Sequence, residues 1–488
     1  MIAGPAWRLR PLHVLVLLHR WISIGVCLLF ALWFASGAVM LFVPFPALDD
    51  ARWRERAEPL DLGRVTATPA AALAAVRDAT SLRLVSAERS PRYVAAGASG
   101  PPQIIDAETG HEAPPIDAAA AMRIAERFGR ARAKTATLVG HDQWVVHQGF
   151  DAERPYYRVS LDDAVRTDLY VSRPTGEVRQ ETTRRQRALN TVGSVLHWLY
   201  FTPLRRNWAA WDAVVWWVSL TGIAGASTGL IAGTVRYLQG RRLRGAGFAL
   251  YRGWLQWHHI LGLFAGGFLL AWIVSGWLSM DHGRLFSTSG ATVQERDALR
   301  GLPLARVVEG LDAGALALAA QGTASRSAAR IDFVGLGGRG HVLARDATSA
   351  ALRAADGSLQ RQFSAAAIAE AAAAAWPGES VTPAILSQSV GFYGRAEGVG
   401  ADAVALALRS SQRLAFINPR SGEIEALLDA SRRRYAWWYY ALHTGRLPGS
   451  EGHGDLRISL LLAFLAAGCA LSLTGVVLAW RHLRGGPR

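Results

Sequence analysis

Four long runs of apolar residues dominate the hydropathy pattern of the chain. They cover residues 13–43, 210–235, 256–280 and 456–480. Each run has the length of about 20 residues that an α-helix needs to cross a bilayer core of about 30 Å. The first run is too long for the apolar part of a secretory signal and no clear cleavage site follows it, so we expect it to be retained. The pattern therefore predicts an integral membrane protein with four membrane-spanning helices.

The two long segments between these runs, 44–209 and 281–455, have the mixed polarity of water-exposed domains. Alanine-rich, helix-forming stretches occur at 67–80, 116–134, 311–320 and 365–376. Strand-like stretches follow them and end in turns that contain Gly preceded by Asn or Asp, which suits tight hairpins. We expect each segment to form a pair of small α+β units. The predicted fold class is a four-helix membrane bundle with two extracytoplasmic α+β loop domains.

The two halves of the chain match each other. The first run matches the third at an offset of 239, and the second matches the fourth at an offset of 246. The matched positions are His19 and His258, His197 and His443, Trp33 and Trp272, Ser36-Gly37 and Ser275-Gly276, and Thr228-Gly229 and Thr474-Gly475. Two matches in the same order with nearly equal offsets predict a tandem duplication.

The charge of the chain indicates its orientation in the membrane. There are 53 basic and 38 acidic residues, giving a formal net charge of +15. Such an excess can indicate nucleic acid, but the long apolar runs between the charged blocks favour a membrane and no nucleic-acid partner. The short flanks, with Arg8 and Arg10, the loop 236–255 and the tail 481–488, contain arginines and no acid. The positive-inside rule therefore puts both termini and this loop in the cytoplasm and the two long segments outside.

These features together resemble the PepSY-associated transmembrane family. The resemblance covers nearly the whole chain and rests on the Leu-His-Arg-Trp sequence at 18–21, the Ser-Gly pairs, the Leu-His elements at 196–197 and 442–443, the Thr-Gly pairs and the Gly-Glu turns of the loops. Characterised members look like bacterial inner-membrane ferric-siderophore reductases that hold b-type haem between their helices. The resemblance implies PepSY-like units in the loops and electron transfer across the inner membrane to a periplasmic ferric chelate, for iron uptake.

Four histidines are the candidate haem ligands. Ionisable groups inside a membrane are costly and therefore mark function, and imidazole is a common axial ligand of haem iron. His19 lies a few residues inside the first run and His258 at the corresponding point of the third, which has the same direction, so they can meet near the cytoplasmic face. His197 and His443 belong near the outer face. We expect two haem b groups, held without thioether bonds because the chain has no C-x-x-C-H motif.

A structural interpretation of these histidines stays open, since an interfacial histidine copied by duplication would also match. The outer pair requires helices that begin before the apolar boundary, or a site at the membrane surface. His259 and its counterpart Arg20 could each bind a haem propionate, and His259 could replace His258 as the ligand. His282 has no matched partner and is expected only at the membrane interface.

Two other functions are compatible with the sequence: a non-redox siderophore transport or accessory protein, and a PepSY-type regulator of secreted proteases. No cytoplasmic nucleotide-binding domain is recognisable in the sequence. If the protein is a reductase, its electrons must come from a membrane quinol or a separate reductase.

Overall fold

The computed structural model describes residues 10–74, 76, 79–97, 100–244, 250–288, 290–384 and 388–485. Arg8 and the end of the basic tail lie outside this range. The chain divides into two units. Unit 1 comprises Met1–Phe45, Ala188–Ser287 and Arg432–Arg488, and unit 2 comprises Pro46–Arg187 and Thr288–Ser431.

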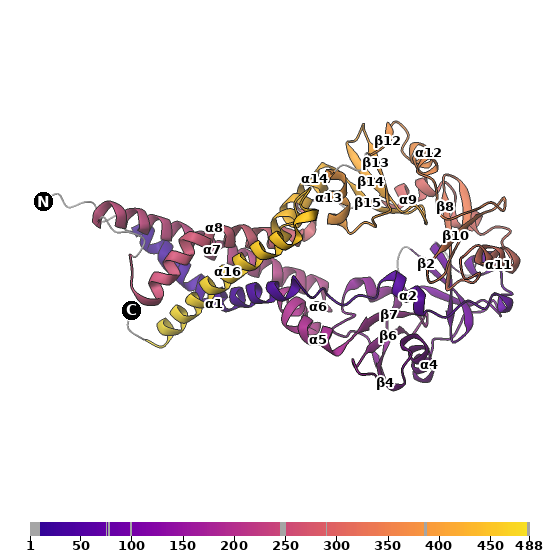
Figure 1. Cartoon of the computed structure of the whole chain (residues 1–488), viewed down its shortest axis with the longest axis horizontal. Coiled ribbons are helices and arrows are strands. Elements are labelled where there is room, and N and C mark those ends of the chain that lie inside the picture. The colour runs from indigo at the N-terminus through magenta and orange to yellow at the C-terminus, as the bar shows by residue number, and fades with distance from the viewer. Residues whose placement is uncertain are drawn as a thin grey trace. The chain divides into compact units, whose positions relative to one another are not determined.

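Unit 1 contains four long helices that correspond to the four apolar runs (Figure 1). They are α1 (Arg10–Met40), α7 (Trp208–Arg244), α8 (Gly253–Ser279) and α16 (Gly454–Leu483). Each is long and apolar enough to cross a membrane, as predicted. Their ends differ from the hydropathy boundaries for local reasons. α7 continues through the basic segment because arginine is a good helix former, whereas α1 ends before Pro44 and Pro46, which lack the backbone N–H that a helix requires.

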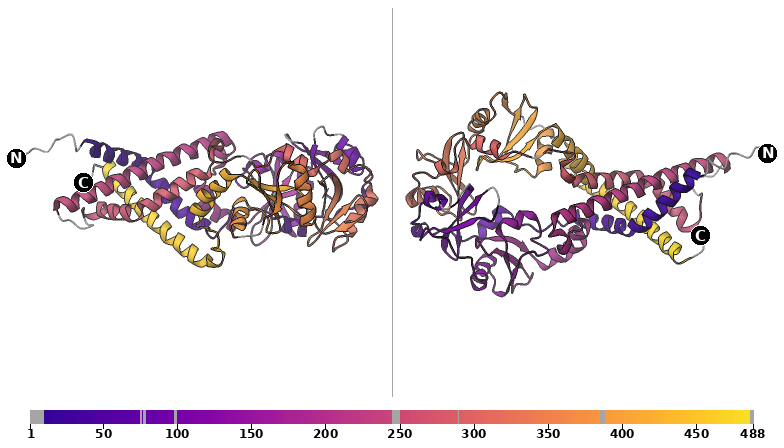
Figure 2. Two further views of the ribbon diagram at one scale, coloured as in Figure 1. Left: turned by 90° about the horizontal axis from the view of Figure 1, so that it is seen from above. Right: turned by 180° about the vertical axis from the view of Figure 1, so that it is seen from behind.

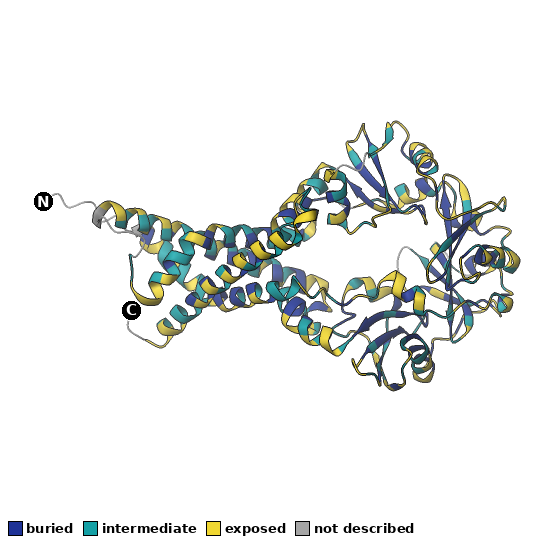
Figure 3. Ribbon diagram, viewed as in Figure 1, coloured by how far each residue is buried: buried dark blue, intermediate teal, exposed yellow. Residues whose placement is uncertain are grey.

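The four helices run alongside one another in each view of the bundle (Figure 2). α1 and α8 each pack against both α7 and α16. The bundle core contains Phe30 and Phe34 of α1, Trp272 of α8, and Leu465 and Leu471 of α16. Exposed and half-exposed residues line the outer surfaces of the helices (Figure 3). In a bilayer these largely apolar outer faces contact lipid tails.

Short helical segments precede α7 and α16 and follow α8. They are α5 (Arg184–Asn190), a π-helical turn (Thr191–Val195), α6 (Thr202–Arg205), a 3-10 turn (His282–Arg284), α14 (Ala430–Ala436), a second π-helical turn (Trp437–Ala441), α15 (Leu442–Thr444) and a 3-10 turn (Glu451–His453). π-helical turns occur frequently at functional sites. Here each of the two π-helical turns ends just before one of the Leu-His elements.

Within the described residues, unit 2 contains three antiparallel sheets. The largest has seven strands in the order β11-β10-β9-β8-β1-β2-β3, and the others have the orders β4-β5-β6-β7 and β12-β13-β14-β15. The strands are β1 (Ala79–Ala87), β2 (Ser90–Gly97), β3 (Gln103–Asp106), β4 (Ala133–Val139), β5 (Tyr156–Leu161), β6 (Asp168–Ser172), β7 (Val178–Thr182), β8 (Arg330–Leu336), β9 (Arg339–Arg345), β10 (Ala350–Ala354), β11 (Leu359–Gln360), β12 (Val381–Pro383), β13 (Val404–Leu408), β14 (Arg413–Ile417) and β15 (Ile424–Leu428).

The helices of unit 2 alternate with groups of strands along the chain. They are α2 (Asp50–Arg56), a 3-10 turn (Leu62–Arg64), α3 (Pro69–Ala74), α4 (Ala118–Gly129), a 3-10 turn (Gln148–Glu153), α9 (Val293–Arg300), α10 (Leu304–Val307), α11 (Ala313–Gln321), α12 (Ala365–Ala375) and α13 (Gln388–Glu397). The alternation of helices with antiparallel strands confirms the α+β character of both loops. The helix expected at 67–80 is shorter than predicted, because the chain from Ala79 onward pairs with β2.

The first units of the two loops are joined in a way that the sequence did not predict. β1 pairs with β8 in antiparallel register, with Arg83 opposite Asp332. The seven-stranded sheet is therefore built from both loops. Its core is likewise shared, since Leu84 and Tyr93 pack in the same cluster as Ile331.

Candidate functional site

Unit 1 brings the four candidate histidines together as two pairs. The ring centroids of His19 and His258 are 6.1 Å apart, and those of His197 and His443 are 6.3 Å apart. We call these the His19 pair and the His197 pair. His19 lies on α1 and His258 on α8, whereas His197 follows the first π-helical turn and His443 lies on α15. Each pair therefore joins one residue from each half of the chain.

The two pairs lie at two levels of the bundle. Ser36, whose hydroxyl lies 3.2 Å from Nδ1 of His197, comes 17 residues after His19 on the same helix. At about 1.5 Å per residue this corresponds to roughly 25 Å, comparable with the thickness of a bilayer core. His197 does not reach the outer level through an earlier start of α7, which begins at Trp208. A short helical segment instead packs against α1, and it carries His197 to this depth.

The Nδ1 atom of each of the four rings is held by a hydrogen bond. Its partners are the Gly225 carbonyl for His19 at 3.0 Å, Thr474 Oγ1 for His258 at 2.9 Å, Ser36 Oγ for His197 at 3.2 Å and Ser275 Oγ for His443 at 3.1 Å. The three hydroxyls each donate to a carbonyl of their own helix, so they accept from Nδ1–H. This tautomer leaves the lone pair of Nε2 available. Fixing one ring nitrogen by a hydrogen bond is typical of metal-ligating histidines.

A glycine on a neighbouring helix packs against each of the four rings. A Cβ added to the glycine would lie 2.5 Å from His19 Cε1 at Gly229, 3.2 Å from His443 Cε1 at Gly276, 3.5 Å from His197 Cε1 at Gly37 and 3.7 Å from His258 Cε1 at Gly475. These are the glycines of the repeated Ser-Gly and Thr-Gly pairs. The motifs therefore have a physical role in the structure: in three of the four, the hydroxyl fixes the ring and the glycine leaves room for it. Thr228 is the exception, because Nδ1 of His19 bonds to the Gly225 carbonyl and not to the Thr228 hydroxyl.

The arrangement can hold a metal centre that needs two protein ligands. Among the described residues there is no group of three or more His, Cys, Asp or Glu side chains suited to a bare ion, which usually takes four ligands from protein or water. A haem iron needs only two axial ligands, because the porphyrin supplies the other four. Two imidazoles on opposite sides of one metal, with bonds of about 2 Å, have centroids roughly 6 Å apart. Both pairs have this spacing.

His259 and Arg20 lie beside the His19 pair rather than in it. His258, and not His259, faces His19. His259 is buried, its Nε2 lies 3.1 Å from the Gly233 carbonyl, and its Nδ1 has no hydrogen-bond partner within the described part of the chain. Arg20 is half-buried. The predicted contacts of these two residues with haem propionates stay predictions.

The family follows from comparison with known proteins. The family described as PepSY-associated TM region matches residues 16–482. The chain belongs to this family. All four histidines and the four glycines beside them lie within the match. No curated protein matches the sequence. The PepSY-associated TM match and the four apolar helices together establish a membrane protein.

One acid inside the second span of this PepSY-associated TM protein was not recognised from the sequence. Asp212 lies on α7 and is buried, and its carboxylate accepts a hydrogen bond from Nδ1 of His282. His282 was expected only to lie at the interface. The sequence feature that could have indicated a role for Asp212 is an isolated carboxylate at the start of an apolar run.

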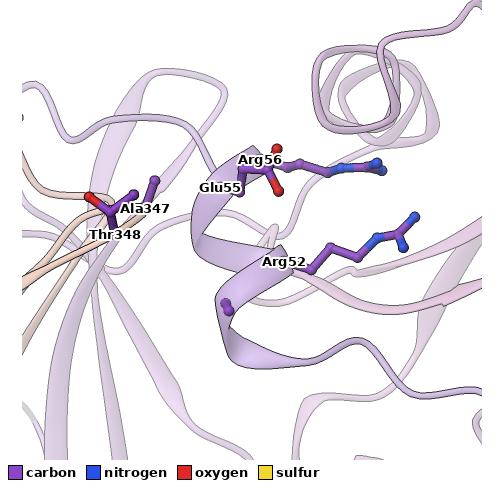
Figure 4. A pocket seen from close by; sticks show the side chains of 6 residues that line it. Arg52, Glu55, Arg56, Ala347 and Thr348 are labelled. Carbon is purple, nitrogen blue, oxygen red and sulfur yellow. The ribbon is translucent and has the colours of Figure 1, made fainter.

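Unit 2 has a hollow of about 360 Å³ lined by α2 and the β9–β10 turn, including Ala347 and Thr348. Figure 4 shows the side chains of Arg52 and Arg56 pointing away from these two residues. Both arginines pair with Glu181, at 2.6 and 3.6 Å. The charged groups therefore serve the packing of unit 2 and do not make the hollow a site.

Proposed function

We propose that this protein is a haem b membrane oxidoreductase of the bacterial inner membrane that reduces a periplasmic ferric chelate, such as a ferric siderophore. The observation that carries the proposal is the presence of two imidazole pairs, with centroids 6.1 and 6.3 Å apart, at two levels of one bundle. In the proposed topology both termini are cytoplasmic, so the His19 pair lies toward the cytoplasm and the His197 pair toward the periplasm. Two haem groups would then provide a path for electrons through the bilayer.

Each group of the chain has a definite task in this proposal. Bound haem supplies one-electron chemistry that protein side chains lack. Nε2 of each histidine would hold the haem iron, and the hydrogen bonds to Nδ1 keep the rings in place. The aromatic core beside the His197 pair, with Phe34 and Trp272 packed at 6.0 Å and Trp272 6.4 Å from His443, would keep water away from this end of the path.

Basic residues beside the His197 pair favour an anion at this level. Arg457 donates to the Thr444 carbonyl at 3.0 Å, and Arg446 donates to the Tyr440 hydroxyl at 3.1 Å. Neither guanidinium forms an ion pair with a carboxylate of the described residues. Their charges are therefore available to a haem propionate or to an anionic ferric chelate.

The visible spectrum of the purified protein tests the proposal. Protein from haem-replete cells is expected to show the Soret and α bands of reducible low-spin haem b, with about two haems per chain. His19→Ala and His197→Ala should each remove about half of this haem, because each deletes a ligand of a different pair. His13→Ala, on the exposed start of α1, is the matched control and should retain both haems. Reduced protein should then reduce an added ferric chelate.

Colourless protein from haem-replete cells would refute the proposal and leave a non-redox role in siderophore transport as the better interpretation. Retention of full haem content in both His19→Ala and His197→Ala would also refute it, since the ligands would then lie elsewhere.

A further inference from the structure

A second polar cluster lies in unit 1, apart from the two histidine pairs. It consists of Asp212 and Trp216 on α7, Trp277 on α8 and His282 after α8, and we call it the Asp212 cluster. The Trp216 ring lies 5.4 Å from that of Trp277 and 5.1 Å from that of His282. His282 donates from Nδ1 to the carboxylate of Asp212. The imidazole is thus oriented by a buried acid and packed against an indole.

Three polar atoms of this cluster are buried and have no hydrogen-bond partner within the described residues. They are Oδ1 of Asp212 and the Nε1 atoms of Trp216 and Trp277. A buried polar group without a partner is destabilising, because it has lost its hydrogen bonds to water. One acceptor and two donors left together indicate a ligand that both donates and accepts hydrogen bonds.

The matched half of the chain shows that the bundle does not need these groups for packing. At the offsets of the repeat, Asp212 corresponds to Ile458, Trp216 to Leu462, Trp277 to Ala38 and His282 to Val43. These four counterparts are all apolar, and they lie on or beside α1 and α16, which pack together as α7 and α8 do. The polar cluster is therefore an addition to one half.

The position of the cluster identifies the class of ligand. Trp277 directly follows Gly276, the glycine that contacts His443. On the other side, the Trp217 ring meets the Trp216 ring edge to face, with centroids 4.8 Å apart, and Trp217 is 61% exposed on a membrane helix. The cluster thus lies at the depth of the His197 pair and continues through Trp217 to the lipid-facing surface of α7. A lipid-soluble molecule that gives up protons and electrons together, a quinol, fits this position.

We propose that the Asp212 cluster binds and oxidises a membrane quinol, which is the electron donor of the reductase; the inference rests on the proposed function. Nε2 of His282 accepts a proton from a quinol hydroxyl, and the resulting imidazolium is stabilised by Asp212. The half-exposed side of His282 then releases the proton to water. Asp281, the neighbouring acid, is occupied by the Phe286 amide at 3.0 Å and by Ser287, so it does not compete for this role.

The reaction balances with the two haem sites. One quinol would lose two electrons, one to each haem site, and two protons, which His282 would pass to water one after the other, and would become a quinone. Bound haem would supply the one-electron chemistry by which two ferric chelates become ferrous. Because the donor gives two electrons and the acceptor takes one, two haem sites allow one quinol to be oxidised completely. A quinol that reacts at the His197 level would give its first electron to the site at that level, and its second electron would follow the path through the bundle to the His19 pair, which would hold it.

Stopped-flow reduction of the holoprotein in lipid nanodiscs tests this inference, with decyl-ubiquinol and menadiol as the probes. The wild-type haem should be reduced by a probe, and Asp212→Asn and His282→Gln should slow this step by about 10²-fold or more, as expected for loss of a proton acceptor. Trp277→Phe, which keeps the ring but removes the N–H, should weaken calorimetrically measured binding of decyl-ubiquinone. Dithionite should reduce the haem of every variant at the same rate. Asp455→Asn and His453→Gln, at the start of α16, are the matched controls.

The failures of the two proposals are distinguishable. Wild-type haem that dithionite reduces but neither quinol reduces would overturn the quinol site and leave the haem proposal intact. Variants that react with quinol and bind quinone like the wild type would overturn it as well. Absence of haem would overturn the proposed function itself.

Discussion

Gly229→Ala is expected to remove the haem of the His19 pair and to leave the haem of the His197 pair in place. A Cβ at this position of α7 would lie 2.5 Å from Cε1 and 2.7 Å from Nδ1 of His19. The ring would have to move, which would break its 3.0 Å hydrogen bond to the Gly225 carbonyl and shift Nε2 away from the iron. Alanine favours a helix interior by about 1 kcal/mol over glycine, so a weaker α7 cannot explain the loss.

Haem content per chain and the thermal unfolding of the bundle are the measurements that check this expectation. Gly233→Ala, one turn further along α7, is the matched control, because its Cβ would make only ordinary contacts, 3.7 Å from Leu263 and 3.9 Å from His259. Gly276→Ala should have a milder effect on the other pair, where the corresponding distance is 3.2 Å. Full haem content and an unchanged spectrum in Gly229→Ala would show that the glycine does not position the ligand.

The part of the fold that follows from local pattern could be predicted from the sequence. Four spans follow from hydropathy, because a lipid environment forces backbone groups into helices, and the α+β character of the loops follows from alanine-rich stretches and turn residues. The pairing of β1 with β8 could not be predicted in this way. It joins strands from two loops, and only tertiary contacts such as those of Leu84 with the Ile331 cluster determine it.

The candidate site could likewise be predicted only where a sequence pattern indicates it. The matched histidines were recognisable because the repeat offsets align them, and the structure brings them together as His19 with His258 and His197 with His443. How His197 reaches its depth depends on a π-helical turn, which has no clear sequence signal. The contact of Asp212 with His282 is not repeated in the other half, so alignment of the halves could not reveal it.

Arg83→Met is expected to destabilise unit 2 by about 3–5 kcal/mol at neutral pH, the range for breaking a buried ion pair. Arg83 on β1 lies 2.6 Å from Glu177 and 2.9 Å from Glu153, and all three side chains are largely buried. Desolvation opposes ionisation of Glu177, but the charges of Arg83, Arg179 and Arg330 outweigh it and hold the pKa of Glu177 below its ordinary value. Without Arg83, the buried carboxylates of Glu153 and Glu177 would face each other with much less positive charge beside them.

The loss of stability in Arg83→Met should decrease as the pH falls. In the wild type the lowered pKa of Glu177 gives stability that is present at neutral pH and is lost only in acid. In the variant, desolvation should raise this pKa, so protonation between about pH 7 and pH 5 would relieve the penalty. Glu153 acts in the same direction, since desolvation and the charge of Glu177 already raise its pKa.

Hydrogen–deuterium exchange of β1 and β7 in the intact protein, at pH 7 and pH 5, measures the difference in stability between Arg83→Met and the wild type. The exposed pair of Arg64 with Glu108, at 2.6 Å, provides the control: Arg64→Met should cost less than about 1 kcal/mol at either pH. Arg83→Met combined with Glu177→Gln should recover part of the stability, because the second change removes the unpaired charge that the first leaves buried. If Arg83→Met proves no more destabilising than Arg64→Met, this cluster does not hold β1 against the β6–β7 turn.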